Sequence, residues 1–117
     1  MTVMTPPPPV RPQPRTQQAA TTECPIPTPI ALWLLAREPM PRPVLTALWN
    51  SPQSVDNTTT VTASVEVLDW LHLYACALTE EHINDRTAAE TRYGFSVYTV
   101  DALREETHWA RVELIDP

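Results

Sequence analysis

The spacing of hydrophobic and polar residues changes partway through residues 58–78. Residues 58–63, TTTVTA, alternate polar and apolar positions with β-branched side chains, which predicts a half-buried strand. From Val65 onward, apolar residues recur at three- and four-residue steps, the period of an amphipathic helix. Ser64 lies between the two segments, where its hydroxyl can accept a backbone N–H of the first helical turn. A strand that leads directly into a capped apolar helix indicates a packed domain.

The apolar runs before this segment predict a helix and a second strand. Thr28 followed by Pro29 is a good N-cap and first-turn pair for a short helix over residues 29–37, and the prolines that follow end it. Residues 44–49, VLTALW, are short, apolar and bounded by Pro and Asn, which favours a strand. The polar turn after them can join this strand to residues 58–63 as an antiparallel hairpin.

The last third of the chain predicts further strands. Residues 79–86 are polar and indicate a turn. Gly94 is the only glycine and predicts the turn of a second hairpin, with residues 95–99 as one of its strands, because glycine takes positive φ at little steric cost. Residues 109–115 alternate apolar and charged positions and can add a strand at the sheet edge. The predicted fold class is α+β, with the order α-β-β-α-β-β, with or without this further strand, and helices on one face of a small antiparallel sheet.

The N-terminal region differs from the rest in composition. Twelve of the 14 prolines lie in residues 1–43. Residues 1–25 hold few large apolar side chains and predict a disordered Pro-rich tail that includes Cys24, followed by a single α+β domain over residues 26–117. The tail either solvates the domain or serves as a polyproline ligand for an aromatic groove. No signal peptide is recognised, and the apolar run Ile30–Ala36 is too short for a membrane span, so we expect a cytoplasmic location.

Charge is divided unevenly along the chain. Residues 1–43 carry a net charge of +2 and residues 44–117 carry −8, which together give the net charge of −6. All eight basic residues are arginine, as is common in proteins from GC-rich bacteria and their phages. An acidic domain repels a polyanion, which argues against nucleic acid as the partner. The alternatives are a winged-helix-like nucleic-acid-binding regulator, with residues 94–115 as the wing, and an acidic inhibitor that mimics nucleic acid.

The sequence resembles small accessory proteins that are common in actinobacteria and their phages. The likeness covers roughly residues 29–100 and rests on the order of elements, on the box Tyr74-Ala75-Cys76-Ala77-Leu78 and on the aromatic hairpin Tyr93-Gly94-Phe95. Such proteins are mostly of unknown function, so the resemblance implies a fold and supplies no site.

Two residues of the central helix have the spacing of metal ligands. His72 and Cys76 are four residues apart and therefore lie on one helix face, as in many zinc sites, and His82 or His108 could complete the shell. The chain has no Cys-x-x-Cys and no second paired ligand motif, and a small thiol is ordinary within an apolar helix. We therefore expect no metal and no cofactor.

Signals for catalysis are missing from the sequence. The chain has no Gly-x-Ser-x-Gly motif, and a single glycine excludes the usual phosphate-binding loops. The acidic pairs Glu80-Glu81 and Glu105-Glu106 lie in polar segments, where a solvated surface explains them better than acid–base chemistry. The sequence predicts that the chain is not an enzyme.

The distribution of aromatic residues favours a role in protein contacts. The central helix carries a second apolar strip beside the one assigned to the sheet, and that strip must meet either the N-terminal helix or a partner. We expect a regulatory or accessory protein-interaction domain that is related to a phage or mobile element. It should bind a protein partner or form a twofold homodimer. We infer no small-molecule ligand. The residues predicted to make contacts are Trp70, Leu73, Tyr98 and Trp109.

Overall fold

The described part of the chain is an α+β fold with a two-stranded antiparallel sheet. The computed structural model describes residues 20–52 and 56–115. In chain order the elements are β2 (Thr22–Pro27), α1 (Thr28–Arg37), α2 (Arg42–Trp49), β3 (Thr58–Ala63), α3 (Val65–Asn84), α4 (Arg86–Tyr93) and α5 (Val97–Ile115). The predicted fold class is confirmed, whereas the predicted order of elements is wrong. Residues 1–19 of the predicted tail lie outside the described residues.

The sheet pairs β2 with β3 and buries one of its faces. Cys24 lies opposite Val61 and Ile26 lies opposite Thr59 in the antiparallel register. These four residues are buried, whereas the alternating positions between them are half-buried or exposed. The hydroxyls of Thr28 and Thr59 lie 2.9 Å apart and satisfy each other within the buried layer. The sheet therefore turns one face to the helices, as the alternation in residues 58–63 predicted.

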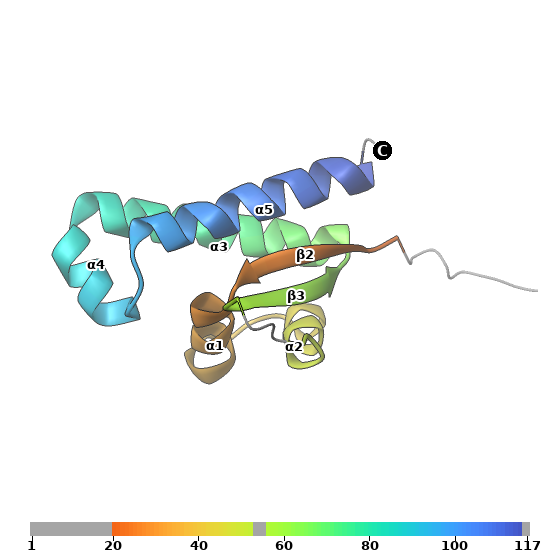
Figure 1. Cartoon of the computed structure of the whole chain (residues 1–117), viewed down its shortest axis with the longest axis horizontal. Helices are drawn as coiled ribbons and strands as arrows, with labels where there is room; N and C mark the ends of the chain where they lie inside the picture. The colour runs from red at the N-terminus through yellow and green to blue at the C-terminus, as the bar shows by residue number, and fades with distance from the viewer. Residues whose placement is uncertain (1–19, 53–55, 116–117) are drawn as a thin grey trace, which may run out of the picture.

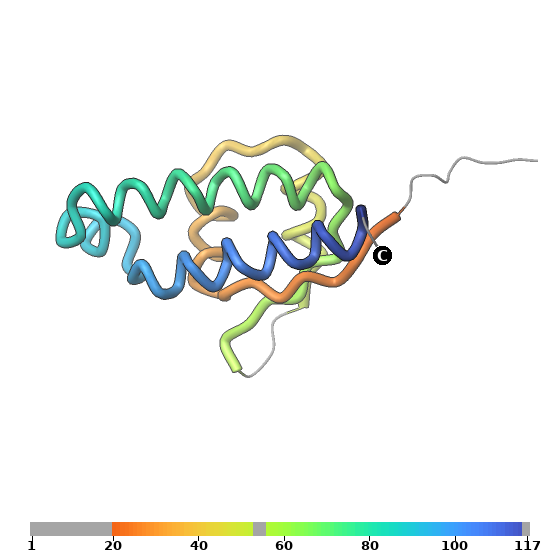
Figure 2. Tube along the Cα trace, turned by 90° about the horizontal axis from the view of Figure 1, so that it is seen from above, coloured from red at the N-terminus to blue at the C-terminus, as the bar shows by residue number. Residues whose placement is uncertain are grey.

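The helices form two groups, one along each side of the two strands. Figure 1 shows α3 and α5 along one side of the two strands and α1 and α2 along the other. Figure 2 shows α3 and α5 running side by side in opposite directions, with the strands at the edge of the molecule. Leu68, Leu71 and Leu103 are completely buried where these elements meet. The core therefore lies in the wedge between the two helix groups, and the sheet covers one side of it.

The central helix begins as predicted and ends later. The hydroxyl of Ser64 accepts the N–H of Val67 at 3.4 Å, which confirms the predicted cap. The helix continues to Asn84, so the turn predicted over residues 79–86 is wrong for most of its length. Asp85 then accepts the N–H of Ala88 at 3.1 Å and caps α4. A capping aspartate had been interpreted as part of a polar loop.

The predicted strand at residues 44–49 is the helix α2. The backbone N–H groups of Val44 and Leu45 both bond to the carbonyl of Pro41, at 3.1 and 3.0 Å, which starts the helix at the prolines. Only Val44 and Leu48 of this helix are buried, and their four-residue spacing is helical. The strand that pairs with β3 is β2, and residues 44–49 are not part of the sheet.

β2 lies within the predicted tail, so the predicted boundary at residue 25 is wrong. The strand begins at Thr22, and Cys24 is completely buried against the core. Pro25 and Pro27 alternate with the buried residues, at positions where a missing N–H removes no bond to β3. An edge strand can therefore contain two prolines, which the interpretation as a tail did not allow for.

The predicted C-terminal strands are not formed, and apart from Phe95 and Ser96, which lie between α4 and α5, their residues are helical. Gly94 has φ of 81° and ends α4 in the left-handed conformation, with its N–H bonded to the carbonyl of Glu90 at 2.9 Å, so it is no hairpin turn. Residues 97–115 form α5, whose buried positions Val100, Leu103, Thr107 and Ala110 follow three- and four-residue steps. The strands expected at residues 95–99 and 109–115 are therefore wrong, and the wing required by the winged-helix alternative does not exist.

Candidate functional site

His72 and Cys76, the two residues with the spacing of metal ligands, are not brought together with further ligands in the described part of the chain. The Nδ1 atom of His72 lies 3.1 Å from the hydroxyl of Thr107, and the rings of His72 and His108 are 6.2 Å apart. The thiol of Cys76 is exposed. Among residues 20–52 and 56–115, no three His, Cys, Asp or Glu side chains lie close enough together to hold a metal ion. His82 is not part of this pair and instead packs in a cluster with the rings of Tyr93 and Phe95, which also contact each other.

Two tyrosines hold the helices α1, α3 and α4 together through carboxylates. The hydroxyl of Tyr93 donates to Glu81 at 2.6 Å, and that of Tyr74 donates to Glu38 at 3.3 Å. Burial, followed by the hydrogen bond to Glu81, raises the pKa of Tyr93 to about 12. Burial also raises the pKa of Tyr74, and the nearby charge of Glu38 adds to the effect. Both phenols therefore stay protonated and act as structural donors, which leaves Glu81 engaged rather than poised as a base.

The four residues predicted to make contacts do not share one surface. The side chains of Leu73, Tyr98 and Trp109 are largely exposed. Trp70 is half-buried and stacks on Tyr74 with ring centroids 5.3 Å apart. Tyr98 lines a hollow beside the end of β2, whereas Trp109 lies near the other end of α5 and packs edge-on against His108. The exposure of Leu73, Tyr98 and Trp109 is in keeping with a contact role. The structure does not place all four residues on one surface.

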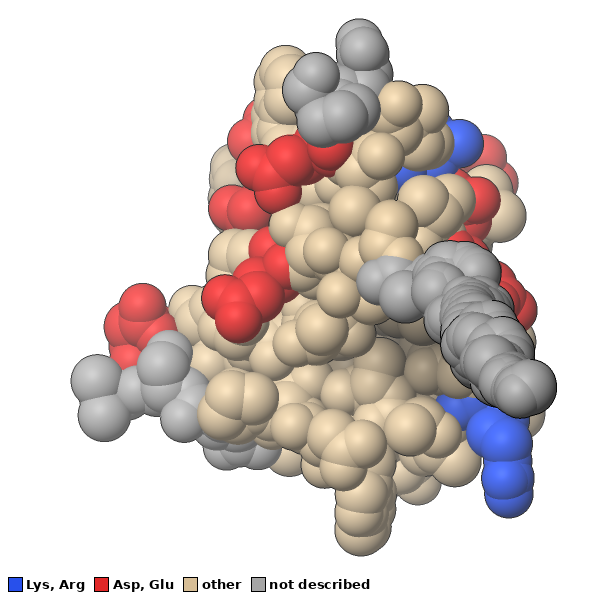
Figure 3. Space-filling view, turned by 90° about the vertical axis from the view of Figure 1, so that its right-hand side faces the viewer, with Lys and Arg blue, Asp and Glu red and all other residues tan. Residues whose placement is uncertain are grey.

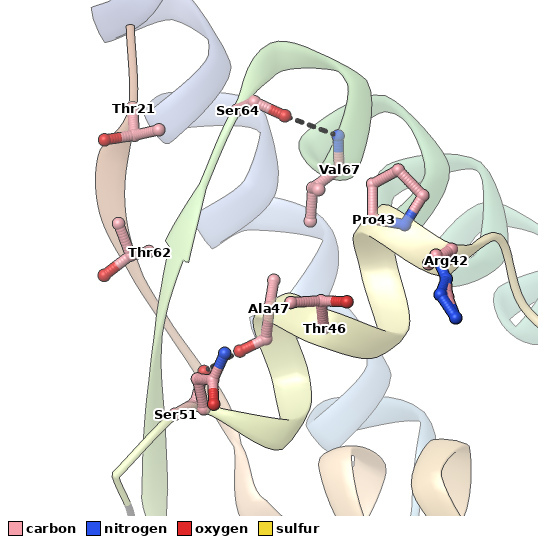
Figure 4. A pocket seen from close by; sticks show the side chains of 10 residues that line it. Thr21, Arg42, Pro43, Thr46, Ala47, Ser51, Thr62, Ser64 and Val67 are labelled. Atoms are coloured by element: carbon pink, nitrogen blue, oxygen red, sulfur yellow. Dashed lines mark hydrogen bonds between the residues drawn. The ribbon is translucent and has the colours of Figure 1, made fainter. Parts of the chain in front are cut away.

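A hollow between α2, the end of β3 and the start of α3 is the best-formed candidate site (Figure 4). Its volume is about 490 Å³, within the range of small-ligand pockets. The hydroxyl of Ser51 donates to the carbonyl of Ala47 at 2.6 Å and fixes the end of α2 beside it. The side chains that Figure 4 labels around the hollow are Thr21, Arg42, Pro43, Thr46, Ala47, Ser51, Thr62, Ser64 and Val67.

The outer face of α2 continues this hollow. A second depression of about 310 Å³ is lined by Arg42, Leu45, Thr46, Trp49 and Asn50, and three of these residues also line the first hollow. Trp49 is 75% exposed, the largest exposure of any tryptophan in the described chain. Leu45 lies one turn earlier on the same helix face and is also exposed. A large aromatic and an aliphatic side chain thus stand in solvent beside a preformed depression.

Among the described residues, Arg42 is the only charged one that lines either hollow. Within the described ranges, Arg86, Arg92, Arg104 and Arg111 each form an ion pair, and Arg37 lies over the ring of Trp33. No such partner is found for Arg42 among the described residues. Figure 3 shows this end of the molecule, with acidic side chains over its upper part and none visible over the lower part, where α2 lies. The surface around α2 is therefore an exception in an acidic protein.

Sequence reasoning did not find this site. Arg42 precedes the segment 44–49, for which a strand was predicted, and Trp49 is the last residue of that segment. The available signal was the pair of prolines at 41 and 43, which are favourable in the first turn of a helix. With a helical spacing, Leu45 and Trp49 fall on one exposed face, next to the face that carries the buried Val44 and Leu48.

Comparison of the chain with family models, with curated proteins and with solved structures gives no match. The resemblance to small actinobacterial and phage proteins therefore stays a prediction. No helix in the described part of the chain has both the length and the apolar character needed to cross a membrane.

Proposed function

We propose that this chain is a cytoplasmic, non-enzymatic protein-interaction module with a regulatory or accessory role, and that the face of α2 is its contact surface. The observation that carries the proposal is the exposed pair Trp49 and Leu45 beside the hollow that contains Arg42. Tryptophan and arginine are the residues that most often dominate binding energy in protein interfaces. An exposed tryptophan next to a depression is also a costly surface for a protein to keep in water.

The distribution of charge supports a protein partner over nucleic acid. Residues 44–117 carry a net charge of −8, and four of the five described arginines other than Arg42 are neutralised by carboxylates. Binding to phosphate backbones requires a set of free cations that displace counterions. A single unpaired arginine provides too little of that effect, but it suffices to orient one acidic group of a protein partner.

The test is affinity capture from a nuclease-treated host lysate, with the full chain and two matched variants. Trp49→Ser removes the aromatic side chain on α2, and Trp109→Ser removes the other strongly exposed tryptophan on α5. Because both side chains are exposed, we expect neither change to unfold the protein. Captured proteins that persist with Trp109→Ser and are lost with Trp49→Ser would support the proposal.

Two results would contradict it. Loss of the same proteins with Trp109→Ser alone would place the contact on α5, where the sequence had suggested it. Capture that neither variant alters, or no specific capture by the full chain, would count against an interaction surface on α2.

A further inference from the structure

The strand β3 has one open stretch of backbone, at its end beside the α2 hollow. The N–H of Thr60 bonds to the carbonyl of Pro52 at 3.2 Å, so the backbone of Thr60 points away from β2. Backbone groups alternate in direction along a strand, and the N–H and C=O of Thr62 must therefore point to the same outer side. No hydrogen-bond partner of these two groups is found among the described residues. Figure 4 shows that β3 lies between β2 and α2, which places this open edge on the side of the hollow.

The other edge of the sheet is closed to an added strand. Pro25 and Pro27 occupy two of the three outward-pointing positions of β2 and supply no N–H there, and the third position is Glu23. The helix α5 also packs along β2, and the hydroxyl of Thr22 donates to Glu113 at 2.6 Å. The carbonyl of Pro52 already bonds to the N–H of Thr60, the middle one of the three outward-pointing residues of β3. The stretch that is open to a short extended segment is therefore the end of β3 at Thr62, beside the hollow.

Charge selects the kind of segment that fits. The hollow contains one charged residue, Arg42, for which no ion pair is found in the described ranges. The N-terminal residues 1–19 of this chain include Arg11 and Arg15 and no acidic residue, so Arg42 would repel them. An acidic segment from another protein would be attracted instead.

We propose that the outer edge of β3 at Thr62 accepts an extended acidic peptide of a partner protein as a third strand. The peptide exchanges backbone hydrogen bonds with Thr62, places a carboxylate against Arg42 and lays apolar side chains toward Ala47 and Val67. Strand addition of this kind takes its affinity from the main chain and its specificity from pockets for alternate side chains. The inference rests on the proposed function, because it names the partner class of the same surface.

The experiment begins with a random 12-residue peptide library displayed on phage and selected on the full-length protein. We expect the enriched peptides to contain Asp or Glu beside β-branched residues. A synthetic peptide of the enriched sequence is then titrated against the variants. Arg42→Gln should weaken binding about 3- to 10-fold, the effect of losing a partly exposed charged contact.

Two substitutions at one position isolate the backbone contact. Thr62→Pro removes the outward N–H without removing a bond to β2, and we expect it to weaken binding of the peptide about 5-fold or more. Thr62→Val keeps the N–H and the β-branched shape, and we expect its affinity for the peptide to lie within about twofold of that of the unmodified chain. As a measurement that needs no variant, hydrogen exchange of the Thr62 amide should slow when the selected peptide binds.

Several outcomes would overturn the strand-addition proposal. They are a library that yields no acidic peptide, a selected peptide that leaves exchange at Thr62 unchanged, and tight binding of a synthetic peptide of residues 1–19. Inorganic phosphate that protects the Arg42 surface while no peptide is selected would reduce the hollow to an anion site. If capture still depends on Trp49 in any of these cases, the α2 interface stands and only strand addition fails.

Discussion

Replacing Gly94 with alanine should destabilise the fold through the backbone alone. Gly94 ends α4 with φ of 81°, a conformation that side chains with a Cβ adopt at a cost of roughly 1–2 kcal/mol. A Cβ built at this position meets no atom within 4 Å, so no steric clash adds to that cost. Alanine also restricts the unfolded chain, which returns about 0.4–1 kcal/mol. We expect Gly94→Ala to lower the free energy of unfolding by about 1 kcal/mol.

Thermal and urea denaturation followed by circular dichroism will measure this difference. For a domain of this size, a loss of 1 kcal/mol lowers Tm by about 4–8 °C. Gly94→Asn is the matched control, because asparagine enters the left-handed region more easily than alanine and should lose less stability. If Gly94→Ala is as stable as the unmodified chain, or more stable, residue 94 does not have a positive φ and the assignment of the α4 cap is refuted.

Four further predictions concern the cap of α3, the reactivity of the two thiols, the ionisation of Cys24 and the buried histidine. Ser64→Ala should cost about 1 kcal/mol in urea denaturation, because it removes the acceptor for the N–H of Val67. In the native protein a thiol reagent should modify the exposed Cys76 at once and Cys24 only after unfolding. Burial, with a smaller effect of Glu106, raises the pKa of Cys24 from 9.0 to about 12. As the pH rises above 9, the thiol therefore ionises first in the unfolded chain, and the free energy of unfolding falls. In Cys24→Val, the free energy of unfolding should fall less between pH 9 and 10. His82→Leu should cost about 1–3 kcal/mol in the same denaturation assay, since the ring lies 2.8 Å from the carbonyl of Leu78 and 3.1 Å from that of Phe95, which it joins across the end of α3.

The junction of β3 and α3 could be predicted because its signals are local. The alternation in residues 58–63, the cap at Ser64 and the helical spacing after Val65 all act within a few residues of one another. The helix predicted over residues 29–37 is present as Thr28–Arg37, but the predicted cap is wrong, because Pro27 is the N-cap and the Thr28 hydroxyl bonds to Thr59 instead of capping the helix. Where the chain carries both a period and a cap, the sequence is sufficient.

Helices α2 and α5 were missed because their residue types suggested strands. Residues 97–115 contain many β-branched and aromatic side chains, which favour strands by propensity. Their buried positions nevertheless follow the helical period, and packing against α3 decides the outcome. Gly94 was correctly expected to need a positive φ, but a hairpin turn and a helix end both require it. Local residue type cannot separate these alternatives, whereas the spacing of the buried residues can.

The candidate site depends on a pairing between segments that are far apart in the chain. Had residues 44–49 paired with β3, they would have covered the edge at Thr62, and neither the open backbone nor the hollow would exist. Instead β2 occupies the inner side of β3, and its two prolines fit there because they point away from the partner strand. The segment 44–49 is thereby left to fold as a helix beside the free edge, with Arg42 and Trp49 on its exposed side. The same prolines that made β2 look like a tail thus leave the open edge of the sheet on the side of Arg42, an arginine for which neither an ion pair nor an aromatic ring contact is found among the described residues.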